Sequence, residues 1–251
     1  MDAVRVTDAD GARWITLARP PLNVLDRDTI HQLHEALAPL PGRRDLKVVV
    51  LRSGLEGTFS AGVDVADHTR ERAPGMLAAF HALFHLLDAL PQSTLAAVDG
   101  RCLGGGCELA AFCDVVLATP RSSFGQPEID VGCFPPVAAV LLPRLVGRAA
   151  HELVLGGAAV SAAEAERIGL INRVAADLDA ETRAWVRRLA AKSGAALALA
   201  RRAVRQGGQG PWADALARAE AIYRSELLAT EDAEEGVRAF LEKRPPRWTD
   251  R

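Results

Sequence analysis

The sequence predicts an α/β fold followed by an all-helical C-terminal part. Strand-like and helix-like segments alternate up to about residue 175, which is typical of an α/β core. From about residue 177 the chain is rich in Ala, Leu, Arg and Glu and has almost no β-branched runs. With 251 residues, of which 49% are hydrophobic and 25% charged, it has the composition of an ordinary globular protein. We therefore divide it into an α/β part, residues 1–176, and a helical part, residues 177–251.

The chain begins with a predicted β-hairpin. Alternating apolar residues at 4–6 and 14–17 flank an Asp-Gly pair at 10–11, which is a strong turn signal. Asp26 is then expected to cap a helix that runs to about Leu40, where a Pro-Gly pair ends it. The N-terminal region therefore predicts a hairpin followed by one helix.

The middle of the chain alternates between predicted strands and helices. Runs of β-branched residues indicate buried strands, and apolar residues at helical spacing indicate the helices between them. Strands are predicted at 46–51, 94–98 and 115–118, a helix from Met76 to Leu87, and a buried helix from the glycines at 104–106 to about Cys113. In the helical part we expect three or four helices with breaks near 207–211 and Thr230, and an alanine-rich stripe at 195–204 that could pack on a partner chain.

Charge and hydropathy exclude several classes of protein. The formal net charge is -2 and the isoelectric point about 6.3, so the chain lacks the basic field of a nucleic-acid binder. No apolar run reaches the roughly 20 residues of a membrane span. The first ten residues lack the apolar stretch of a signal peptide. We therefore expect a cytoplasmic protein that binds neither nucleic acids nor membranes.

No residue pattern indicates a metal site. His81 and His85 would share a helix face, but the glutamate that follows the first histidine in zinc proteases is missing. The four cysteines have no CxxC spacing, so we interpret them as buried core residues: Cys102, Cys107, Cys113 and Cys133. The serine-hydrolase, P-loop and dinucleotide-binding motifs are also absent from the sequence.

Three consecutive glycines, Gly104–Gly106, lie where a predicted strand meets a predicted helix. Glycine costs conformational entropy there and is a poor helix former, so the run needs a reason. One interpretation is close packing of the helix in a crowded core. The other is a ligand that approaches free N–H groups at the helix N-terminus, where an oxygen gaining negative charge would be stabilised. The sequence leaves both interpretations open.

Two glutamates lie in apolar surroundings near these glycines. Glu108 belongs to the first turn of the predicted helix, and Glu128 is flanked by Pro127 and Ile129. A buried carboxylate is costly unless it is paired, so paired general acid–base catalysis is one interpretation. For each glutamate taken singly, a helix cap or a surface salt bridge is the alternative.

Taken together, these segments resemble the crotonase family, the enoyl-CoA hydratases and isomerases. The resemblance covers almost the whole chain and rests on motifs at the separations usual in the family. These motifs are FSAGVDV at 59–65, LGGGCEL at 103–109, FGQPEI at 124–129, SAAEAERIGLINRV at 161–174 and EGVRAFLEKR at 235–244. The resemblance implies a spiral of β-β-α units with the active site in residues 1–176. It also implies that residues 177–251 are a trimerisation region, so we expect a homotrimer or a dimer of trimers.

The resemblance further implies the substrate class and the roles of individual residues. The substrate is an acyl-CoA thioester, and neither a metal nor a redox cofactor is expected. The backbone N–H groups of Ala61 and Gly105 form the oxyanion hole, and Glu108 and Glu128 hold the water that adds to the double bond. Further contacts with CoA are implied for Val63, Asp64 and Val65, which hold the adenine, and for Phe240 and Lys243 of a neighbouring subunit.

One segment departs from the common short-chain hydratases. Residues 134–139 read FPPVAA, where those enzymes carry a glycine-rich PGxGGT stretch. Phe134 and Pro135 are then expected to line the acyl end of the pocket and to change which acyl group fits. Together with PPLNVLD at 20–26 and FSAGVDVADHT at 59–69, this segment resembles the cyclohexa-1,5-diene-1-carbonyl-CoA hydratases of anaerobic benzoyl-CoA degradation.

We therefore expect an enoyl-CoA hydratase-type lyase that adds water to a cyclic dienoyl-CoA. Four alternatives remain. They are a hydratase for another alicyclic or branched acyl chain, a general enoyl-CoA hydratase of fatty-acid β-oxidation, a double-bond isomerase that needs one glutamate, and a non-catalytic binding protein. The last is disfavoured because both glutamates and all three glycines are present.

Overall fold

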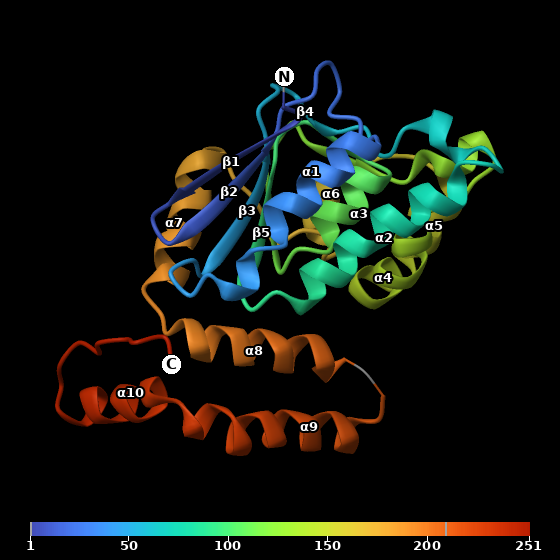
Figure 1. The fold of residues 1–251 in the computed structure, drawn as a ribbon. Helices are drawn as coiled ribbons and strands as arrows, with labels where there is room; N and C mark the ends of the chain where they lie inside the picture. Colours follow the sequence, from blue (N-terminus) through green and yellow to red (C-terminus); the bar gives the residue numbers. More distant parts are fainter. Residues whose placement is uncertain (1, 209) are drawn as a thin grey trace.

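The computed structural model describes residues 2–208 and 210–251. Figure 1 shows an α/β body and, below it, a separate layer of C-terminal helices. A six-stranded sheet forms the centre of the body, in the order β1-β2-β3-β5-β7-β10. Its strands are β1 (Val4–Ala9), β2 (Ala12–Leu17), β3 (Val48–Ser53), β5 (Ser93–Val98), β7 (Val115–Ala118) and β10 (Arg173–Val174). The predicted hairpin is confirmed, because β1 and β2 pair antiparallel around a turn in which Asp10 and Gly11 both have positive φ.

A second sheet of four short strands lies beside the first. Its order is β4-β6-β8-β9, with β4 (Thr58–Ser60), β6 (Arg101–Leu103), β8 (Ser123–Gly125) and β9 (Val160–Ser161). The first three of these strands are parallel. Each follows a strand of the large sheet, so β3-β4, β5-β6 and β7-β8 alternate between the two sheets before the chain enters a helix. The predicted spiral of β-β-α units is therefore confirmed.

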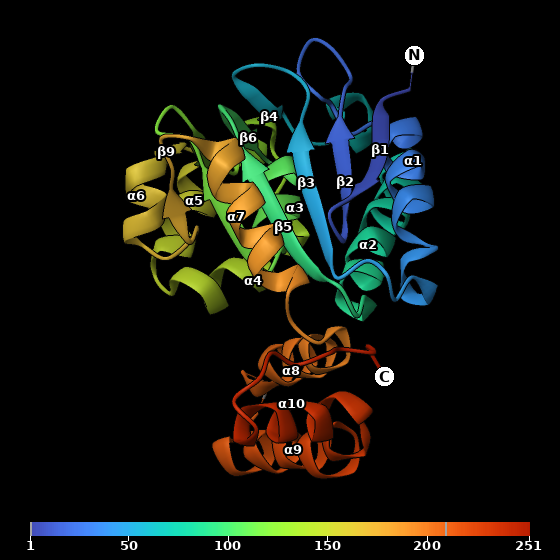
Figure 2. The same cartoon turned by 90° about the vertical axis from the view of Figure 1, so that its left-hand side faces the viewer.

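Helices cover both faces of the large sheet. Those of the body are α1 (Arg27–Leu37), α2 (Ala73–Ala89), α3 (Gly105–Ala111), α4 (Pro136–Val146), α5 (Ala149–Gly156) and α6 (Ala162–Arg167), with the short 3-10 helices η1 (Leu40–Gly42), η2 (Val65–His68) and η3 (Pro127–Val131). Figure 2 shows α1 and α2 on one side of the sheet and α7 (Leu178–Ala190) across the other. Strand β3 is buried on both faces, because Val49 and Leu51 join the core under α1 and α2 while Val48 and Val50 join the core under α7.

The first helix begins where the sequence predicts. The carboxylate of Asp26 accepts a hydrogen bond of 2.9 Å from the backbone N–H of Thr29, which caps the helix. The helix ends at Leu37 and not at Leu40, because Pro39 has no N–H with which to continue the helical ladder. The chain passes instead into η1.

The C-terminal helices form an extension of the body. They are α8 (Gly194–Gly207), α9 (Trp212–Ser225), the short η4 (Leu227–Ala229) and α10 (Glu231–Leu241). The predicted breaks near 207–211 and at Thr230 are confirmed. Because α7 packs on β3, β5 and β7, the helices that stand apart from the body begin at α8. The division of the chain at residues 176 and 177 stays a prediction.

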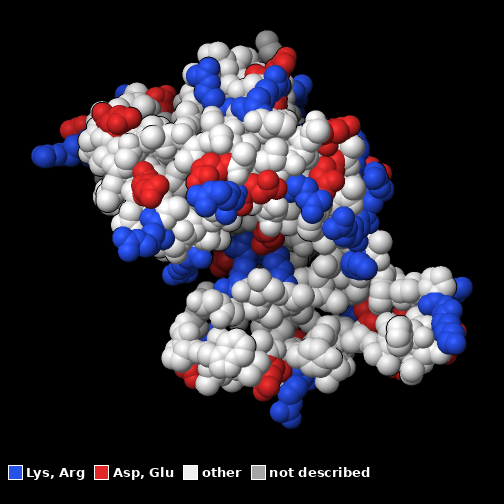
Figure 3. All heavy atoms as spheres, turned by 180° about the vertical axis from the view of Figure 1, so that it is seen from behind, with Lys and Arg blue, Asp and Glu red and all other residues white. Residues whose placement is uncertain are grey.

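Buried ion pairs tie the extension to the body. Arg201 on α8 is 8% exposed and donates to Asp114 at 2.7 Å and to the backbone oxygen of Leu87 at 2.8 Å. Arg205 donates to the other carboxylate oxygen of Asp114 at 2.8 Å. Blue and red atoms mark the junction between the two parts in Figure 3. None of the helices in the described part of the chain is long and apolar enough to cross a membrane.

Candidate active site

Three site segments leave neighbouring strands of the small sheet. Strands β4, β6 and β8 lie side by side and run parallel, so their carboxyl ends share one edge of the sheet. Residues 61–63 follow β4, residues 104–105 follow β6, and residues 126–128 follow β8. Ligands of α/β proteins bind at such an edge. The fold thus brings together three motifs of which the first and the last are more than 60 residues apart in the sequence.

The glycines of the second segment lie in close contact with their neighbours. A Cβ atom on Gly106 would lie 2.6 Å from the Cβ of Ser60, so this glycine allows close packing of α3 on the end of β4. Gly104 has a φ of +51°, and a Cβ there would lie 2.5 Å from Glu128 Oε1. A Cβ on Gly105 would lie 2.7 Å from Val63 Cγ2. Close packing therefore explains the glycine run, and the interpretation that a ligand approaches its N–H groups stays a prediction.

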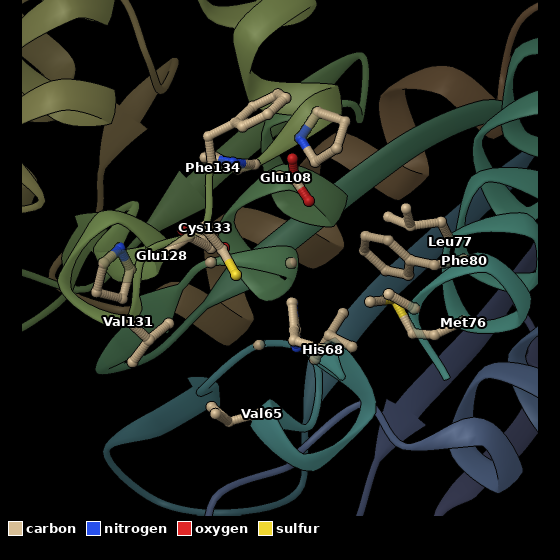
Figure 4. A pocket seen from close by; sticks show the side chains of 18 of the residues that line it. Val65, His68, Met76, Leu77, Phe80, Glu108, Glu128, Val131, Cys133 and Phe134 are labelled. Atoms are coloured by element: carbon tan, nitrogen blue, oxygen red, sulfur yellow. The ribbon is translucent and has the colours of Figure 1, made fainter. Parts of the chain in front are cut away.

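A cavity of about 540 Å³ opens between these segments and helix α2. Figure 4 shows Met76, Leu77 and Phe80 of α2 on one side of it and the two glutamates among its lining residues. The lining residues are Ala61, Gly62, Val63, Val65, His68, Ala73, Met76, Leu77, Phe80, Gly104, Gly105, Glu108, Pro127, Glu128, Asp130, Val131, Gly132, Cys133, Phe134, Pro135 and Pro136. The walls are mostly apolar and the few polar groups converge on one region, which is the usual character of a ligand site.

Glu108 is a buried carboxylic acid in the wall of this cavity. The side chain comes from the first turn of α3 and the residue is 3% exposed. Its Oε1 atom accepts a hydrogen bond of 2.7 Å from the backbone N–H of Ala138 at the start of α4. Burial raises the pKa of Glu108 to about 7, and the nearby Glu128 adds to the rise while the Ala138 N–H opposes it. Near neutral pH this carboxyl can therefore either accept or donate a proton.

Glu128 lies on η3 and contributes the second carboxyl group of the cavity. Its Oε2 atom is buried and has no hydrogen-bond partner among the described residues. Burial raises the pKa of Glu128, while its own backbone N–H and the positive charge of His68 oppose the rise. The structure thus brings both predicted glutamates to one cavity, and their catalytic roles stay a prediction.

The predicted oxyanion hole needs one correction. The backbone N–H of Ala61 donates to the backbone oxygen of Leu22 at 3.0 Å, so it is not available to a ligand. Two residues further along the extended chain, the N–H of Val63 has no acceptor within the described residues. Gly105 is the first residue of α3, where the N–H groups lack helical partners. The free donors beside the cavity are therefore those of Val63 and Gly105.

The remaining predicted residues fall into two groups. Val63, Val65, Phe134 and Pro135 line the cavity, as expected for residues that bind an acyl-CoA. Asp64 does not line it, because its carboxylate caps η2 by accepting the N–H of Ala66 at 3.0 Å.

Two further predicted residues, Phe240 and Lys243, lie on and just after α10, in the extension and far from the cavity of their own chain (Figure 1). The role proposed for them, contact with the CoA of a neighbouring subunit, stays a prediction.

The sequence analysis missed two ionisable residues of the cavity, His68 and Asp130. His68 ends η2, and its Nδ1 atom lies 3.1 Å from the backbone oxygen of Asp64. The Asp-x-x-x-His spacing of a single turn was the available signal, and it is too common to indicate a site. In the described part of the chain no group of three or more His, Cys, Asp or Glu side chains is arranged to hold a metal ion.

Comparisons with known proteins agree with this fold. The family model described as enoyl-CoA hydratase/isomerase matches residues 8–251. The chain is 39% identical over 240 residues to a cyclohexa-1,5-dienecarbonyl-CoA hydratase of Thauera aromatica, covering 94% of this chain and 92% of that protein. It is 34% identical over 230 residues to a crotonyl-CoA hydratase of Syntrophomonas wolfei, covering 89% and 88%.

Solved structures of similar proteins have the same fold. An enoyl-CoA hydratase from Bacillus anthracis superposes with a TM-score of 0.94 at 29% identity, covering 99% of this chain and 100% of that one. One from Mycobacterium smegmatis superposes with a TM-score of 0.92 at 33% identity, covering 98% of each chain. A family model that spans nearly the whole sequence, together with these relatives, shows that the chain belongs to the enoyl-CoA hydratase/isomerase family.

Proposed function

We propose that this enzyme of the enoyl-CoA hydratase class adds water to a conjugated cyclic dienoyl-CoA thioester. One observation carries the hydration chemistry. Glu108 and Glu128 line a single apolar cavity beside two free backbone N–H groups, those of Val63 and Gly105. This set provides two carboxyl groups for proton transfer and two donors for one oxygen, which is what addition of water to a conjugated thioester requires.

The two N–H groups stabilise charge on the thioester oxygen. When water adds to the far carbon of the conjugated system, electron density moves to the carbonyl oxygen and an enolate forms. The N–H groups of Val63 and Gly105 donate to that oxygen, and the N-terminus of α3 adds a partial positive charge. Donors of this kind are worth about 3–4 kcal/mol each in the transition state.

The two carboxyl groups move the protons. Glu108, held by the Ala138 N–H, accepts a proton from the water as its oxygen bonds to the far carbon. Glu128, whose pKa is raised by burial, delivers a proton to the carbon next to the thioester. One O–H bond of water breaks, one C–O and one C–H bond form, and no electrons are gained or lost overall. We therefore propose that the reaction needs neither a metal nor a redox cofactor, and that treatment with a chelator leaves the activity unchanged.

The walls of the cavity support a bulky, rigid acyl group. One wall is formed by Phe134, Pro135 and Pro136, and glycines at these positions would make that wall flexible. The opposite wall is formed by Phe80 and Met76 of α2. Stiff walls discriminate by shape better than flexible ones. The similarity to the Thauera aromatica protein supports a six-membered ring in this space.

A direct comparison of two substrates tests the proposal. Hydration of crotonyl-CoA and of cyclohexa-1,5-diene-1-carbonyl-CoA is measured for the wild type, E128Q and the control E56Q, whose side chain is exposed. We expect a preference for the cyclic diene that E128Q loses and E56Q retains. Preference for crotonyl-CoA would keep the hydratase and reject the cyclic substrate. Movement of a double bond without hydration would indicate an isomerase.

We also propose that the protein assembles as a trimer, or as a dimer of trimers, through the helical extension. Large apolar side chains are exposed there, and Figure 3 shows a broad uncharged area on it. The exposed residues are Val204, Trp212, Leu216, Tyr223, Leu228, Val237, Phe240 and Leu241. Patches of this size on a water-exposed surface usually mark an interface. Sedimentation velocity should give a multiple of three for the wild type and smaller species for F240D, whereas V6D on the edge strand β1 should leave the assembly intact.

The four cysteines support the expected cytoplasmic location. All are free thiols, and Cys102, Cys107 and Cys113 are buried in the core. Burial together with the neighbouring Cys107 raises the pKa of the Cys102 thiol well above its usual range. Free thiols are usual in a reducing compartment.

A further inference from the structure

His68 is a polar residue of the cavity to which neither the motifs nor the proposed mechanism gives a task. It ends η2, whose first turn is capped by the Asp64 carboxylate, and it lines the same cavity as Glu108 and Glu128 (Figure 4). Its Nδ1 atom lies 3.1 Å from the backbone oxygen of Asp64. Because a carbonyl oxygen can only accept, Nδ1 carries the hydrogen of this bond and Nε2 is the ring atom left for another partner.

Glu128 has an oxygen in need of such a partner. Its Oε1 atom lies against Gly104, where a methyl group would come within 2.5 Å of it. Its Oε2 atom is buried and has no hydrogen-bond partner among residues 2–208 and 210–251. Buried carboxyl oxygens in native proteins are nearly always hydrogen-bonded to protein or to ordered water. The positive charge of His68 acts on Glu128, so the two side chains lie within electrostatic reach of each other.

The proposed hydration also leaves a proton imbalance at this residue. Each turnover places a proton on Glu108 and removes one from Glu128. Glu128 must then be reprotonated inside a largely apolar cavity before the next water can add. A group with an exchangeable proton, close to Oε2 and able to change charge near neutral pH, would supply it, and histidine is the side chain suited to this.

We propose that His68 is a positioning residue for Glu128, joined through Nε2 and one bridging water to Oε2, and that it returns a proton to this carboxyl after each turnover. The step is balanced. The imidazolium Nε2–H bond breaks, the bridging water passes the proton on, and an O–H bond forms on Oε2. The neutral ring then takes a proton from solvent. The inference rests on the proposed hydration, while the His68–Glu128 link itself can be measured in the resting protein.

Other ionisable groups lie near His68. Glu108 from α3 and both Glu128 and Asp130 from η3 line the cavity with it. Asp64 and Asp67 lie on its own turn, and Asp67 pairs at 3.9 Å with Arg72, which precedes α2. Helix α2 contributes the apolar residues Ala73, Met76, Leu77 and Phe80 to the same cavity.

The first test needs no substrate. Protein labelled with carbon-13 at the glutamate carboxyls is titrated by NMR, and the Glu128 signal is identified by its loss in E128Q. We expect the Glu128 pKa to be higher in H68Q than in the wild type, because the cation is lost. H31A, which removes an exposed histidine of α1 whose partner is Glu35, serves as the matched control and should leave the signal unchanged. A Glu128 titration that is identical in H68Q and wild type overturns the link.

The second test uses turnover. We expect H68A to lower kcat about tenfold with little change in KM. A tenfold change corresponds to a shift of about one unit in the pKa of the Glu128 carboxyl. Imidazole added to H68A should restore part of kcat, and it should have no effect on E128Q. Thermal unfolding of H68A and H68Q shows that both are folded. A wild-type kcat in H68A, or a loss that imidazole does not restore, overturns the relay. If the wild type hydrates no enoyl-CoA, the proposed function fails, whereas the NMR result for the link stands separately.

Discussion

A methyl group on Gly104 would lie 2.5 Å from the Oε1 atom of Glu128. The two residues follow different strands of the small sheet, β6 and β8, and meet because those strands are neighbours. Gly104 also has a φ of +51°, which favours glycine. The position of the Glu128 carboxyl therefore depends partly on the absence of a side chain at Gly104.

Replacing Gly104 by alanine should displace this carboxyl. We expect G104A to lower kcat by at least tenfold and to destabilise the protein by about 1 kcal/mol or more, because a side chain is forced into the left-handed region. The matched control is G156A in α5, where a Cβ would meet no atom within 4 Å. It should leave activity intact and raise stability slightly. Chemical denaturation and steady-state kinetics check both variants, and wild-type kinetics in G104A would contradict the prediction.

The raised pKa of Glu108 makes stability depend on pH. Its ordinary pKa is 4.5 and its value in the folded protein is about 7, so between these values the folded state binds the extra proton. Stability therefore falls as pH rises from about 5 to about 7, by up to about 3 kcal/mol. We expect the stability of E108Q to fall much less over this pH range, so that E108Q is more stable than the wild type at pH 8. Urea unfolding at a series of pH values tests it, and parallel curves for the two proteins would argue against the assigned shift.

The corrected oxyanion hole can be tested one N–H at a time. Replacing the amino acid by the corresponding hydroxy acid turns the backbone amide into an ester and removes only the N–H. At Val63 we expect kcat to fall about 10²–10³-fold, as for loss of an oxyanion donor. At Ala61 the ester should cost about 1 kcal/mol of stability through the lost bond to Leu22, with little effect on kcat. The reverse pattern would restore the original assignment.

The attachment of the extension depends on a buried cation. Replacing Arg201 by methionine leaves Asp114 and several backbone oxygens without this partner, and we expect a loss of about 3–5 kcal/mol. Arg202, one residue along, is more exposed and pairs with Glu226, so R202M should cost under about 1 kcal/mol. Differential scanning calorimetry compares the two. A small effect of R201M would mean that Arg205, which also pairs with Asp114, and the other contacts of α8 hold the extension without Arg201.

Much of the fold follows from local patterns in the sequence. The Asp10–Gly11 turn, the Asp26 cap and the helix breaks in the extension depend on residues adjacent in the chain, and each lies where it was predicted. The pairing of strands β4, β6 and β8 depends on residues far apart, so only the family resemblance suggested it.

The site, too, could be predicted only where the signal lies in neighbouring residues of the sequence. Glu108 and Glu128 were recognisable because charged residues rarely occur in apolar runs. Which backbone N–H faces the cavity was not, because it depends on the path of the chain at Gly62, whose φ is +96°. Ala61 on one side of this glycine bonds to Leu22, while Val63 on the other side does not. His68 carried no unusual spacing, and its importance appears only when β8 brings Glu128 beside η2.

The extension holds Phe240 and Lys243 away from the cavity of their own chain. If these residues complete the CoA site of a neighbour, an isolated subunit has the catalytic groups but makes only part of the contacts that bind CoA. Specific activity would then depend on protein concentration, and dilution would raise KM before it lowered kcat. Two defective proteins, E108Q and K243E, would also complement each other when mixed and reassembled, because some interfaces would unite an intact cavity with an intact extension. Each chain of this enzyme would then be fully active only within the assembly, because a neighbouring chain supplies part of its CoA site.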